Sequence, residues 1–488
     1  MALPMTRLMR EALRAAAYGG IGAALVLITV FVIYLNGRSD LQVWHLTALD
    51  EEFTAGADIT TLDDYLALED RLFAQLDRMV YAAVPAAQGT SINRYSRGSL
   101  ADPQRWPRNW NRSFVLSTTS PKAAVLLLHG MSDSPYSLHA LGEHLNAAGA
   151  YVIGLRMPGH GTVPSGLVEL TWQDMDAAVS LAVRDLARRF GEIPLYIVGY
   201  STGAALAVNY ALATLDDPTL PKVDRLALLS PAIGVTPAAA LAVWQARLGH
   251  LLGLEKLAWS DILPEYDPFK YGSFAVNAGD VVYRLTKEIQ RRLAEMKRQG
   301  RLGAFPPVLA FSSIVDATVS TPALVAGLFA NLPAGGHELV LFDINRRAEI
   351  EPILAWDPSA IIRVLQEDSQ RAYNLSLVTN EAPRSSRVVM RSKGPEDKDE
   401  RKVALELSWP TDIYSLAHVA LPFAPEDPIY GGRPAIPSPG IKLGNIAMRG
   451  ERGALQVSAA DMLRLRWNPF YSFVQRRVTS FLGLQRDG

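Results

Sequence analysis

Short apolar runs alternate with amphipathic helical segments between residues 123 and 343, and this alternation restricts the fold more than any other feature of the sequence. Successive strands that are joined by helices pair in parallel, and the helices then cover both faces of the sheet. The sequence therefore predicts an α/β fold with a mostly parallel central sheet. Strands are expected at 123–128, 151–156, 194–199, 225–230, 307–315 and 338–343, and helices at about 135–148, 172–190, 203–215 and 321–331.

Two stretches interrupt the alternation. Residues 236–304 are largely helical, with an apolar start and a charged helix at 283–298. Because they are inserted between two core strands, we expect a helical cap over the carboxyl ends of the sheet. Residues 346–401 form a second insertion with a predicted hairpin at 374–380 and 386–393. The tail from 430 to 488 carries no recognisable motif.

The N-terminal region predicts a membrane anchor. Residues 15–35 contain no charged side chain, and an apolar helix of ~20 residues spans a bilayer. Residues 1–14 carry three arginines, so the positive-inside rule predicts a cytoplasmic N-terminus, a single-pass transmembrane helix and an exported remainder, periplasmic in a bacterium. A cleaved signal peptide and a buried core helix are the alternatives. Residues 36–121 are expected to form a polar stalk and an irregular lead-in with a helix at 61–81, ahead of the main domain at 122–488.

Composition excludes several classes of function. With 48 basic and 49 acidic residues, the chain has no net field that would attract nucleic acid. The absence of cysteine excludes disulfides, thiolate metal sites and a cysteine nucleophile. His139, Glu143 and His144 do not have the spacing of a zinc motif, and neither a P-loop nor G-x-G-x-x-G follows a predicted strand. We therefore expect no metal and no cofactor, and the sequence leaves the oligomeric state open.

A G-x-S-x-G pentapeptide identifies the candidate nucleophile. The predicted strand 194–199 leads directly into Gly199-Tyr-Ser-Thr-Gly203, and a predicted helix follows. A sharp strand–turn–helix connection of this kind exposes the serine hydroxyl above the sheet, and the glycines allow the backbones to approach closely. Ser201 is therefore the predicted nucleophile.

A serine hydroxyl needs a general base, and the base needs an acid that orients it. In folds built around this pentapeptide the order is serine, acid, histidine, which leaves His337 and His418 as candidate bases. His337 opens a strand and so lies at the amino edge of the sheet, whereas His418 follows the extended run 403–409 at the carboxyl edge. His418 is the predicted base. Asp316, after the run 308–315, is the predicted acid, and Asp343 is the alternative.

The tetrahedral intermediate needs hydrogen-bond donors for its oxyanion. The backbone amide of Thr202, at the start of the helix after Ser201, is one predicted donor. The second is expected in the turn after strand 123–128, where we choose the amide of Met131. His129 is expected to pack under that turn, and His160 is expected to be structural.

Five segments carry a family resemblance: Leu126-Leu-Leu-His-Gly130, Arg156-Met-Pro-Gly-His-Gly161, Gly199-Tyr-Ser-Thr-Gly203, Val315-Asp-Ala-Thr-Val319 and Ser415-Leu-Ala-His-Val419. Together they resemble the branch of the α/β-hydrolases that contains monoacylglycerol lipases, lysophospholipase-like proteins and serine aminopeptidase-like proteins. The resemblance implies an α/β-hydrolase fold, Ser201 as nucleophile, Asp316 as acid, His418 as base, and an oxyanion hole formed by the amides of Met131 and Thr202. The gap of 102 residues from Asp316 to His418 (418 − 316) is longer than is usual in this branch, and the region before residue 122 lies outside the resemblance.

These observations predict a membrane-anchored serine hydrolase that cleaves carboxylic esters, of lipid or acylglycerol type, through an acyl-enzyme. The apolar start of the cap and the anchor both suit a lipid ester. An amidase or peptidase with the same triad, a lipid-synthesis acyltransferase, and a non-catalytic anchored scaffold remain the alternatives.

Overall fold

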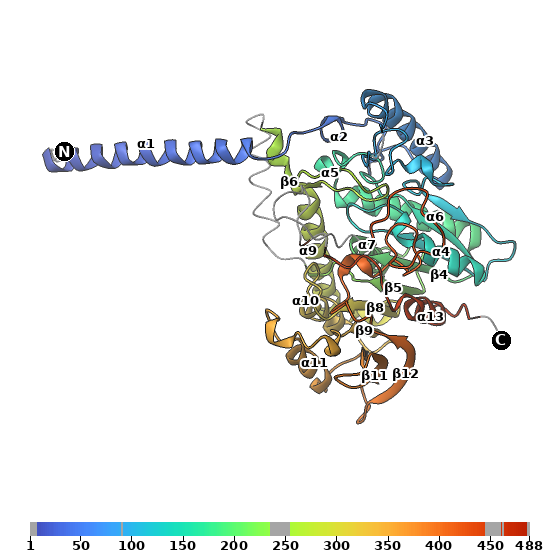
Figure 1. Cartoon of the computed structure of the whole chain (residues 1–488). Helices are drawn as coiled ribbons and strands as arrows, with labels where there is room; N and C mark the ends of the chain where they lie inside the picture. The colour runs from blue at the N-terminus through green and yellow to red at the C-terminus, as the bar shows by residue number, and fades with distance from the viewer. Residues whose placement is uncertain (1–6, 89–90, 235–253, 445–459, 461–462, 486–488) are drawn as a thin grey trace.

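A ten-stranded sheet with helices on both faces forms the centre of the computed structural model, which describes residues 7–88, 91–234, 254–444, 460 and 463–485 (Figure 1). The strand order is β1-β3-β2-β4-β5-β8-β9-β10-β11-β12. Neighbours from β3 through β10 pair in parallel, whereas β1, β11 and β12 pair antiparallel to their neighbours. The predicted α/β class and mostly parallel sheet are confirmed.

All six predicted core strands are present, with ends within two residues of the prediction. They lie in the interior of the sheet, and their side chains alternate between its two faces. Two further strands, β6 (Trp259–Asp261) and β7 (Phe274–Ala275), form a small separate sheet. The strands of the main sheet are β1 (Phe114–Leu116), β2 (Ala123–Leu128), β3 (Ala150–Leu155), β4 (Leu195–Tyr200), β5 (Arg225–Leu229), β8 (Val308–Ser313), β9 (Glu338–Phe342), β10 (Asn374–Asn380), β11 (Arg387–Lys393) and β12 (Arg401–Ser408).

Helices cover the two faces of the sheet and bury one hydrophobic core on each. The larger core lies under α5, α6, α7, α9, α10 and α11, and the smaller one lies under α4 and α13. Helix α13 comes from the tail in which the sequence carried no motif. The bounds are α4 (Tyr136–Ala147), α5 (Gly166–Glu169), α6 (Trp172–Phe190), α7 (Thr202–Asp216), α9 (Val276–Arg298), α10 (Thr321–Gly327), α11 (Pro358–Glu367) and α13 (Tyr471–Phe481).

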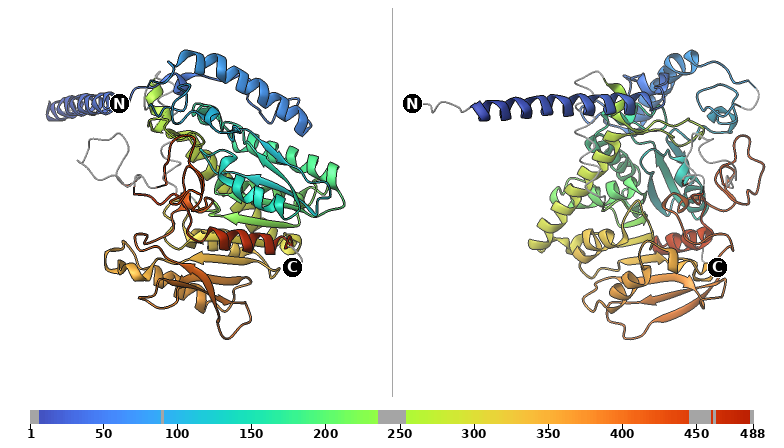
Figure 2. Two further views of the ribbon diagram at one scale, coloured as in Figure 1. Left: turned by 45° about the vertical axis from the view of Figure 1, so that its right-hand side comes forward. Right: turned by 60° about the vertical axis from the view of Figure 1, so that its left-hand side comes forward.

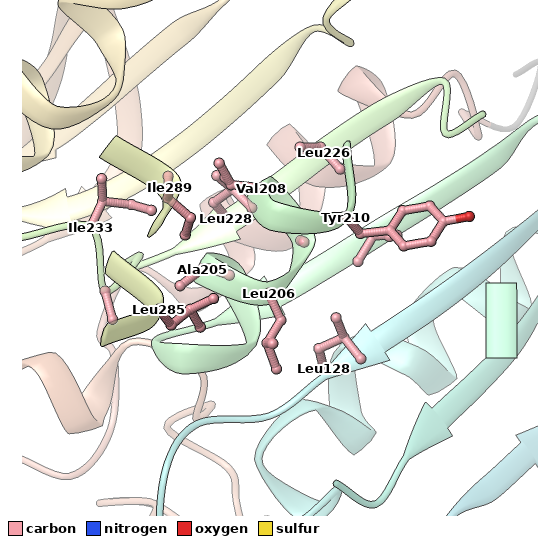
Figure 3. Packing of buried hydrophobic residues seen from close by; sticks show 14 of the residues in the cluster. Leu128, Ala205, Leu206, Val208, Tyr210, Leu226, Leu228, Ile233, Leu285 and Ile289 are labelled. Atoms are coloured by element: carbon pink, nitrogen blue, oxygen red, sulfur yellow. The ribbon is translucent and has the colours of Figure 1, made fainter. Parts of the chain in front are cut away.

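Helix α7 is buried on nearly all sides because it lies between the sheet and α9. Figure 3 shows Leu206 of α7 close to Leu128 of β2, and Leu285 and Ile289 of α9 close to Ala205. The helix predicted at 283–298 is confirmed, because α9 extends from Val276 to Arg298. Its position differs from the expected cap, because α9 packs along α7 in the helix layer instead of standing over the strand ends. Most of the apolar start of the predicted cap, 236–260, lies outside the described residues, which resume at 254, where Leu257 and Trp259 are buried.

The second insertion extends the central sheet. Its predicted hairpin is present as β10 and β11, and a third strand, β12, pairs with β11. β10 pairs in parallel with β9, so the insertion adds three strands at the edge of the sheet (Figure 2). Because β11 reverses the chain and β12 reverses it again, the chain leaves β12 at the same edge as it leaves β8 and β9.

The N-terminal helix α1 (Arg7–Asn36) projects away from the rest of the molecule (Figures 1 and 2). None of the helices in the described part of the chain combines the length and the apolar character that a membrane span requires. The predicted transmembrane anchor at 15–35 is therefore not supported, nor are the single-pass topology and the export that were inferred from it. Most of residues 15–24 are alanine or glycine, which bury little apolar surface per residue.

The segment that follows α1 packs on the main domain instead of forming a free polar stalk. It contains α2 (Val43–Leu46) and α3 (Leu62–Met79), the second of which matches the predicted helix at 61–81. Trp44 and Phe53 are buried, and the hydroxyl of Tyr65 on α3 donates a hydrogen bond of 2.7 Å to the carbonyl oxygen of Arg156. The lead-in is thus bound directly to the loop that follows β3.

Candidate active site

Ser201 occupies a strained turn between β4 and α7. Its backbone angles are φ 53° and ψ −114°, a conformation that L-residues rarely adopt and that usually marks a functional site. A Cβ added to Gly199 would lie 2.5 Å from Cα of Ala204, and one added to Gly203 would lie 2.2 Å from the carbonyl oxygen of Leu128. Both glycines of the pentapeptide are therefore required by the close approach of the backbones.

The turn after β2 lies directly against this serine turn. A Cβ on Gly130 would lie 3.0 Å from the ring of Tyr200, the residue before Ser201. Thr202 is the first residue of α7, where backbone N–H groups have no partner within the helix. The structure thus places the amides of Thr202 and Met131 on two adjoining turns at the carboxyl edge of the sheet, where oxyanion donors are needed.

Asp316 and His418 are brought together although 102 residues separate them. Oδ2 of Asp316 lies 2.9 Å from Nδ1 of His418, and both side chains are buried. The other carboxylate oxygen, Oδ1, accepts the backbone N–H groups of Thr318 at 2.8 Å and Val319 at 2.9 Å. These bonds hold the carboxylate rigidly and direct Oδ2 at the imidazole.

A returning loop carries His418 from the edge of the sheet back to its centre. The side-chain amide of Asn345, just after β9, donates to the carbonyl oxygens of Pro410 at 3.2 Å and Ile413 at 2.8 Å. His418 then begins a short 3-10 helix, η8 (His418–Ala420), and its ring lies 5.5 Å from that of Tyr200. The imidazole is therefore bonded to Asp316 and packed beside the residue that precedes Ser201.

The environment of Asp316 favours its charged form. Burial alone would raise the pKa of this carboxyl, but the charge of His418 and the hydrogen bonds from His418, Val319 and Thr318 outweigh it and leave the pKa below its ordinary value. An acid that is charged at neutral pH can orient an imidazole in the way that a catalytic triad requires.

The two alternative residues have other partners. Asp343, the alternative acid, forms hydrogen bonds of 2.8 and 3.0 Å with the guanidinium of Arg346 and accepts the hydroxyl of Thr379 at 2.7 Å. His337, the alternative base, lies at the amino edge of β9, where its Nδ1 accepts the backbone N–H of Val308 at 3.1 Å. Burial lowers the pKa of His337 to about 4, so it is a neutral structural residue.

His129 and His160 lie beneath the turns that approach Ser201. Both rings are buried and lie 5.0 Å apart, and each contacts backbone groups of these turns. Burial lowers the pKa of His129 well below 6.5 and that of His160 to about 4. Both are neutral, as expected for histidines that hold loops in place.

Residues 264–273 support the turn after β2, and the sequence alone did not reveal this role. The backbone N–H of Tyr271 donates to the carbonyl oxygen of Ser132 at 2.9 Å, and Nζ of Lys270 lies 3.2 Å from Oδ1 of the buried Asp133. The sequence contains no motif that would reveal this charged pair, because its two residues are 137 positions apart (270 − 133). In the described part of the chain, no group of three metal-ligating side chains comes together.

Comparisons with known proteins find similarity to hydrolases. Residues 119–343 match the family model described as serine aminopeptidase, S33. The chain is 26% identical over 258 residues to lipase LipV of Mycobacterium tuberculosis, a match that covers 50% of this chain and 93% of that protein.

Two solved structures of lipases also align with about half of the chain. The monoacylglycerol lipase of Paleococcus ferrophilus is 22% identical, with a TM-score of 0.35 and coverage of 47% of this chain and 88% of that one. The monoglyceride lipase of Saccharomyces cerevisiae is 17% identical, with a TM-score of 0.35 and coverage of 47% and 81%. The family match over residues 119–343, the parallel sheet and the strained serine turn together indicate that the main domain has an α/β-hydrolase fold and is similar to the serine aminopeptidase, S33 family.

Proposed function

We propose that this lipase- and esterase-type hydrolase cleaves carboxylic esters through an acyl-enzyme formed on Ser201, with His418 as general base and Asp316 as the acid that orients it. The observation that carries the proposal is the buried hydrogen bond of 2.9 Å between Asp316 and His418, which lies beside the strained serine turn. The carboxylate and the imidazole are 102 residues apart in sequence, and they meet at the edge of the sheet where the strained serine also lies.

The reaction follows from this arrangement. His418 accepts the proton of the Ser201 hydroxyl as its oxygen attacks the ester carbonyl, and the amides of Met131 and Thr202 donate to the oxyanion that forms. The imidazolium then gives its proton to the departing alcohol. Water, activated by the same imidazole, hydrolyses the acyl-enzyme and restores Ser201. Asp316 holds the proton of His418 on Nδ1 throughout, so Nε2 is free to accept.

The proposed substrates are lipid or acylglycerol esters, by similarity to lipase LipV. The serine aminopeptidase description of the family model favours a second candidate, hydrolysis of amide bonds by the same residues. An ester and an amide with the same acyl group, compared by kcat/KM, separate the two. A ratio in favour of the ester supports the proposal, and faster turnover of the amide supports the second candidate.

Labelling with a fluorophosphonate tests the nucleophile. We expect the wild-type protein to be labelled and Ser201→Ala to lose both labelling and hydrolysis of p-nitrophenyl esters. Ser230→Ala is a matched control, because Ser230 also stands after a core strand, is buried and has a positive φ of 41°. If Ser201→Ala is still labelled, or if Ser230→Ala loses labelling while it remains folded, Ser201 is not the nucleophile.

A further inference from the structure

Residues of the N-terminal lead-in hold a buried arginine beside the candidate active site. Arg156 directly follows β3 and is 1% exposed. Its guanidinium forms ion pairs with two carboxylates, Glu52 at 2.9 Å and Glu69 of α3 at 3.2 Å. Both residues precede residue 119, where the family match begins. The partners of this buried charge therefore come from a part of the chain that the family model does not contain.

Arg156 and Glu52 in turn hold the loop after β3. The guanidinium donates to the carbonyl oxygen of His160 at 3.0 Å, and the carboxylate of Glu52 accepts the backbone N–H of Gly159 at 2.9 Å. An arginine fork bound to a carboxylate by two parallel hydrogen bonds is geometrically rigid. The loop from 156 to 160 is thus fixed from one side by the lead-in.

Glu69 is itself fully engaged. It accepts the backbone N–H and the hydroxyl of Ser113, both at 2.8 Å, while the Ser113 oxygen accepts the backbone N–H of Arg156 at 2.8 Å. Burial raises the pKa of Glu69, and Arg156 and Ser113 oppose this rise. A group in such an enclosed network cannot shift without moving Arg156.

His129 connects this loop to the candidate oxyanion hole. Its Nε2 accepts the backbone N–H of Met157 at 3.1 Å, so the proton of the neutral ring is on Nδ1, which donates to the carbonyl oxygen of Gly130 at 2.9 Å. The same carbonyl oxygen accepts the backbone N–H of Asp133 at 3.2 Å. In a trans peptide the C=O of Gly130 and the N–H of Met131 point in opposite directions, so fixing the oxygen fixes the direction of the Met131 N–H.

We propose that Glu52 and Glu69 of the lead-in are positioning residues for the oxyanion hole and act through Arg156, Met157 and His129. The contacts form one continuous series from α3 to the Gly130–Met131 peptide. The lead-in is then a working part of the active site and not only a structural addition. This inference rests on the proposed function for the role of the Met131 amide, whereas the series of contacts itself does not.

The kinetic test uses two substitutions and their combination. Glu52→Gln keeps the shape of the side chain but removes the charge that holds Arg156, and we expect kcat for a p-nitrophenyl ester to fall about tenfold with KM changed less than about twofold, since a small misplacement of an oxyanion donor acts on the transition state. In His129→Asn, the side-chain amide keeps an N–H donor near the position of Nδ1, but the shorter side chain cannot accept the backbone N–H of Met157. In that background, Glu52→Gln should lower kcat by less than about twofold, because the series is already interrupted.

Asp343→Asn is the matched control for lost stability. It removes the charge of a carboxylate that, like the partly exposed Glu52, is paired with an arginine, here Arg346, at the same edge of the sheet. We expect it to lower the unfolding temperature about as much as Glu52→Gln, with kcat nearly unchanged. An equal loss of kcat in the two variants, or the full tenfold loss from Glu52→Gln in the His129→Asn background, would overturn the inference.

A measurement without substrate separates this inference from the proposed function. In protein labelled with ¹⁵N at histidine, the Nδ1 proton of His129 should exchange with solvent slowly in the wild type and faster in Glu52→Gln and Glu69→Gln, because the loop that covers it loosens. An unchanged exchange rate in both variants contradicts the inference. If the wild type hydrolyses no ester and binds no fluorophosphonate, the proposed function fails, and the exchange rates still decide whether the lead-in positions His129.

Discussion

Replacing Asp316 with asparagine should disable the candidate triad through the tautomer of His418. In the structure, Oδ1 of Asp316 accepts the N–H groups of Thr318 and Val319, and Oδ2 faces Nδ1 of His418 at 2.9 Å. An asparagine must keep its carbonyl oxygen toward the two backbone donors, so its NH₂ group faces the imidazole. Nδ1 then becomes an acceptor, and the ring proton moves to Nε2, the atom that has to accept the proton of Ser201.

The size of the expected loss of kcat follows from this change of the His418 tautomer. Both carboxylate oxygens are occupied and buried, so the amide has no alternative orientation that would restore a donor at Nδ1. The same substitution in trypsin-like proteases, where an equivalent tautomer is forced, lowers kcat about 10⁴-fold. At ~1.4 kcal/mol for each factor of ten, this corresponds to about 5 kcal/mol of transition-state stabilisation. KM should change little, because Asp316 is buried behind His418.

Steady-state hydrolysis of a p-nitrophenyl ester measures the loss, and the rate of fluorophosphonate labelling measures it independently of acyl-enzyme breakdown. Asp343→Asn is the control, since Asp343 is bonded to Arg346 and not to a histidine. If Asp316→Asn retains more than about a tenth of wild-type kcat, or if it changes KM alone, the tautomer argument is refuted. If Asp343→Asn shows the larger loss of kcat, the acid has been wrongly assigned.

Two further predictions concern the serine turn and the acid stability of the fold. Gly203→Ala should lower kcat and reduce stability by at least about 2 kcal/mol, because its Cβ would lie 2.2 Å from the carbonyl oxygen of Leu128. Kinetics and thermal unfolding check this against Gly303→Ala, whose added Cβ would meet nothing within 4 Å. Equal behaviour of the two variants would contradict the prediction. Burial lowers the pKa of His337 from 6.5 to about 4, so the unfolded chain binds more protons than the folded chain between these pH values. The contribution of His337 to the free energy of unfolding is therefore complete above pH 6.5 and is lost as the pH falls toward 4, by at most about 3 kcal/mol. Urea unfolding at several pH values should show a shallower fall of stability for His337→Gln than for the wild type, and parallel curves would refute the assignment.

The sequence predicted the parts of the fold that depend on local pattern. The core strands and the helices between them follow from runs of apolar residues and from helical periodicity, and their ends match closely. The pentapeptide around Ser201 has a local geometric cause, since the strained turn requires glycine on both sides. Asp316 and His418 were chosen by their place after strands and their order in the chain, and the structure brings these two side chains together.

Long-range contacts were not predictable from the pattern. The residues of the second insertion form three strands, but nothing in them specifies that they pair with β9 and not with each other alone. The ion pairs of Arg156 with Glu52 and Glu69 join residues that are 104 and 87 positions apart, and each of these residues alone resembles an ordinary surface charge. The anchor prediction overestimated a segment in which alanine and glycine supply much of the length, and the stalk prediction overlooked the buried Trp44 and Phe53.

The returning loop at Asn345 has a consequence for how this fold can vary. His418 reaches Asp316 from a loop that is fastened next to β9, so its position depends on that fastening point and not on the outermost strand. β10 is coupled to this fastening point, because the side-chain amide of Asn380 donates to Oδ1 of Asn345 at 3.1 Å. The outer pair of strands, β11 and β12, can therefore be lost or exchanged together while the chain still returns at the same edge of the sheet. The hairpin of β11 and β12 is in this sense a replaceable edge of the sheet, outside the contacts that hold the candidate pair of Asp316 and His418.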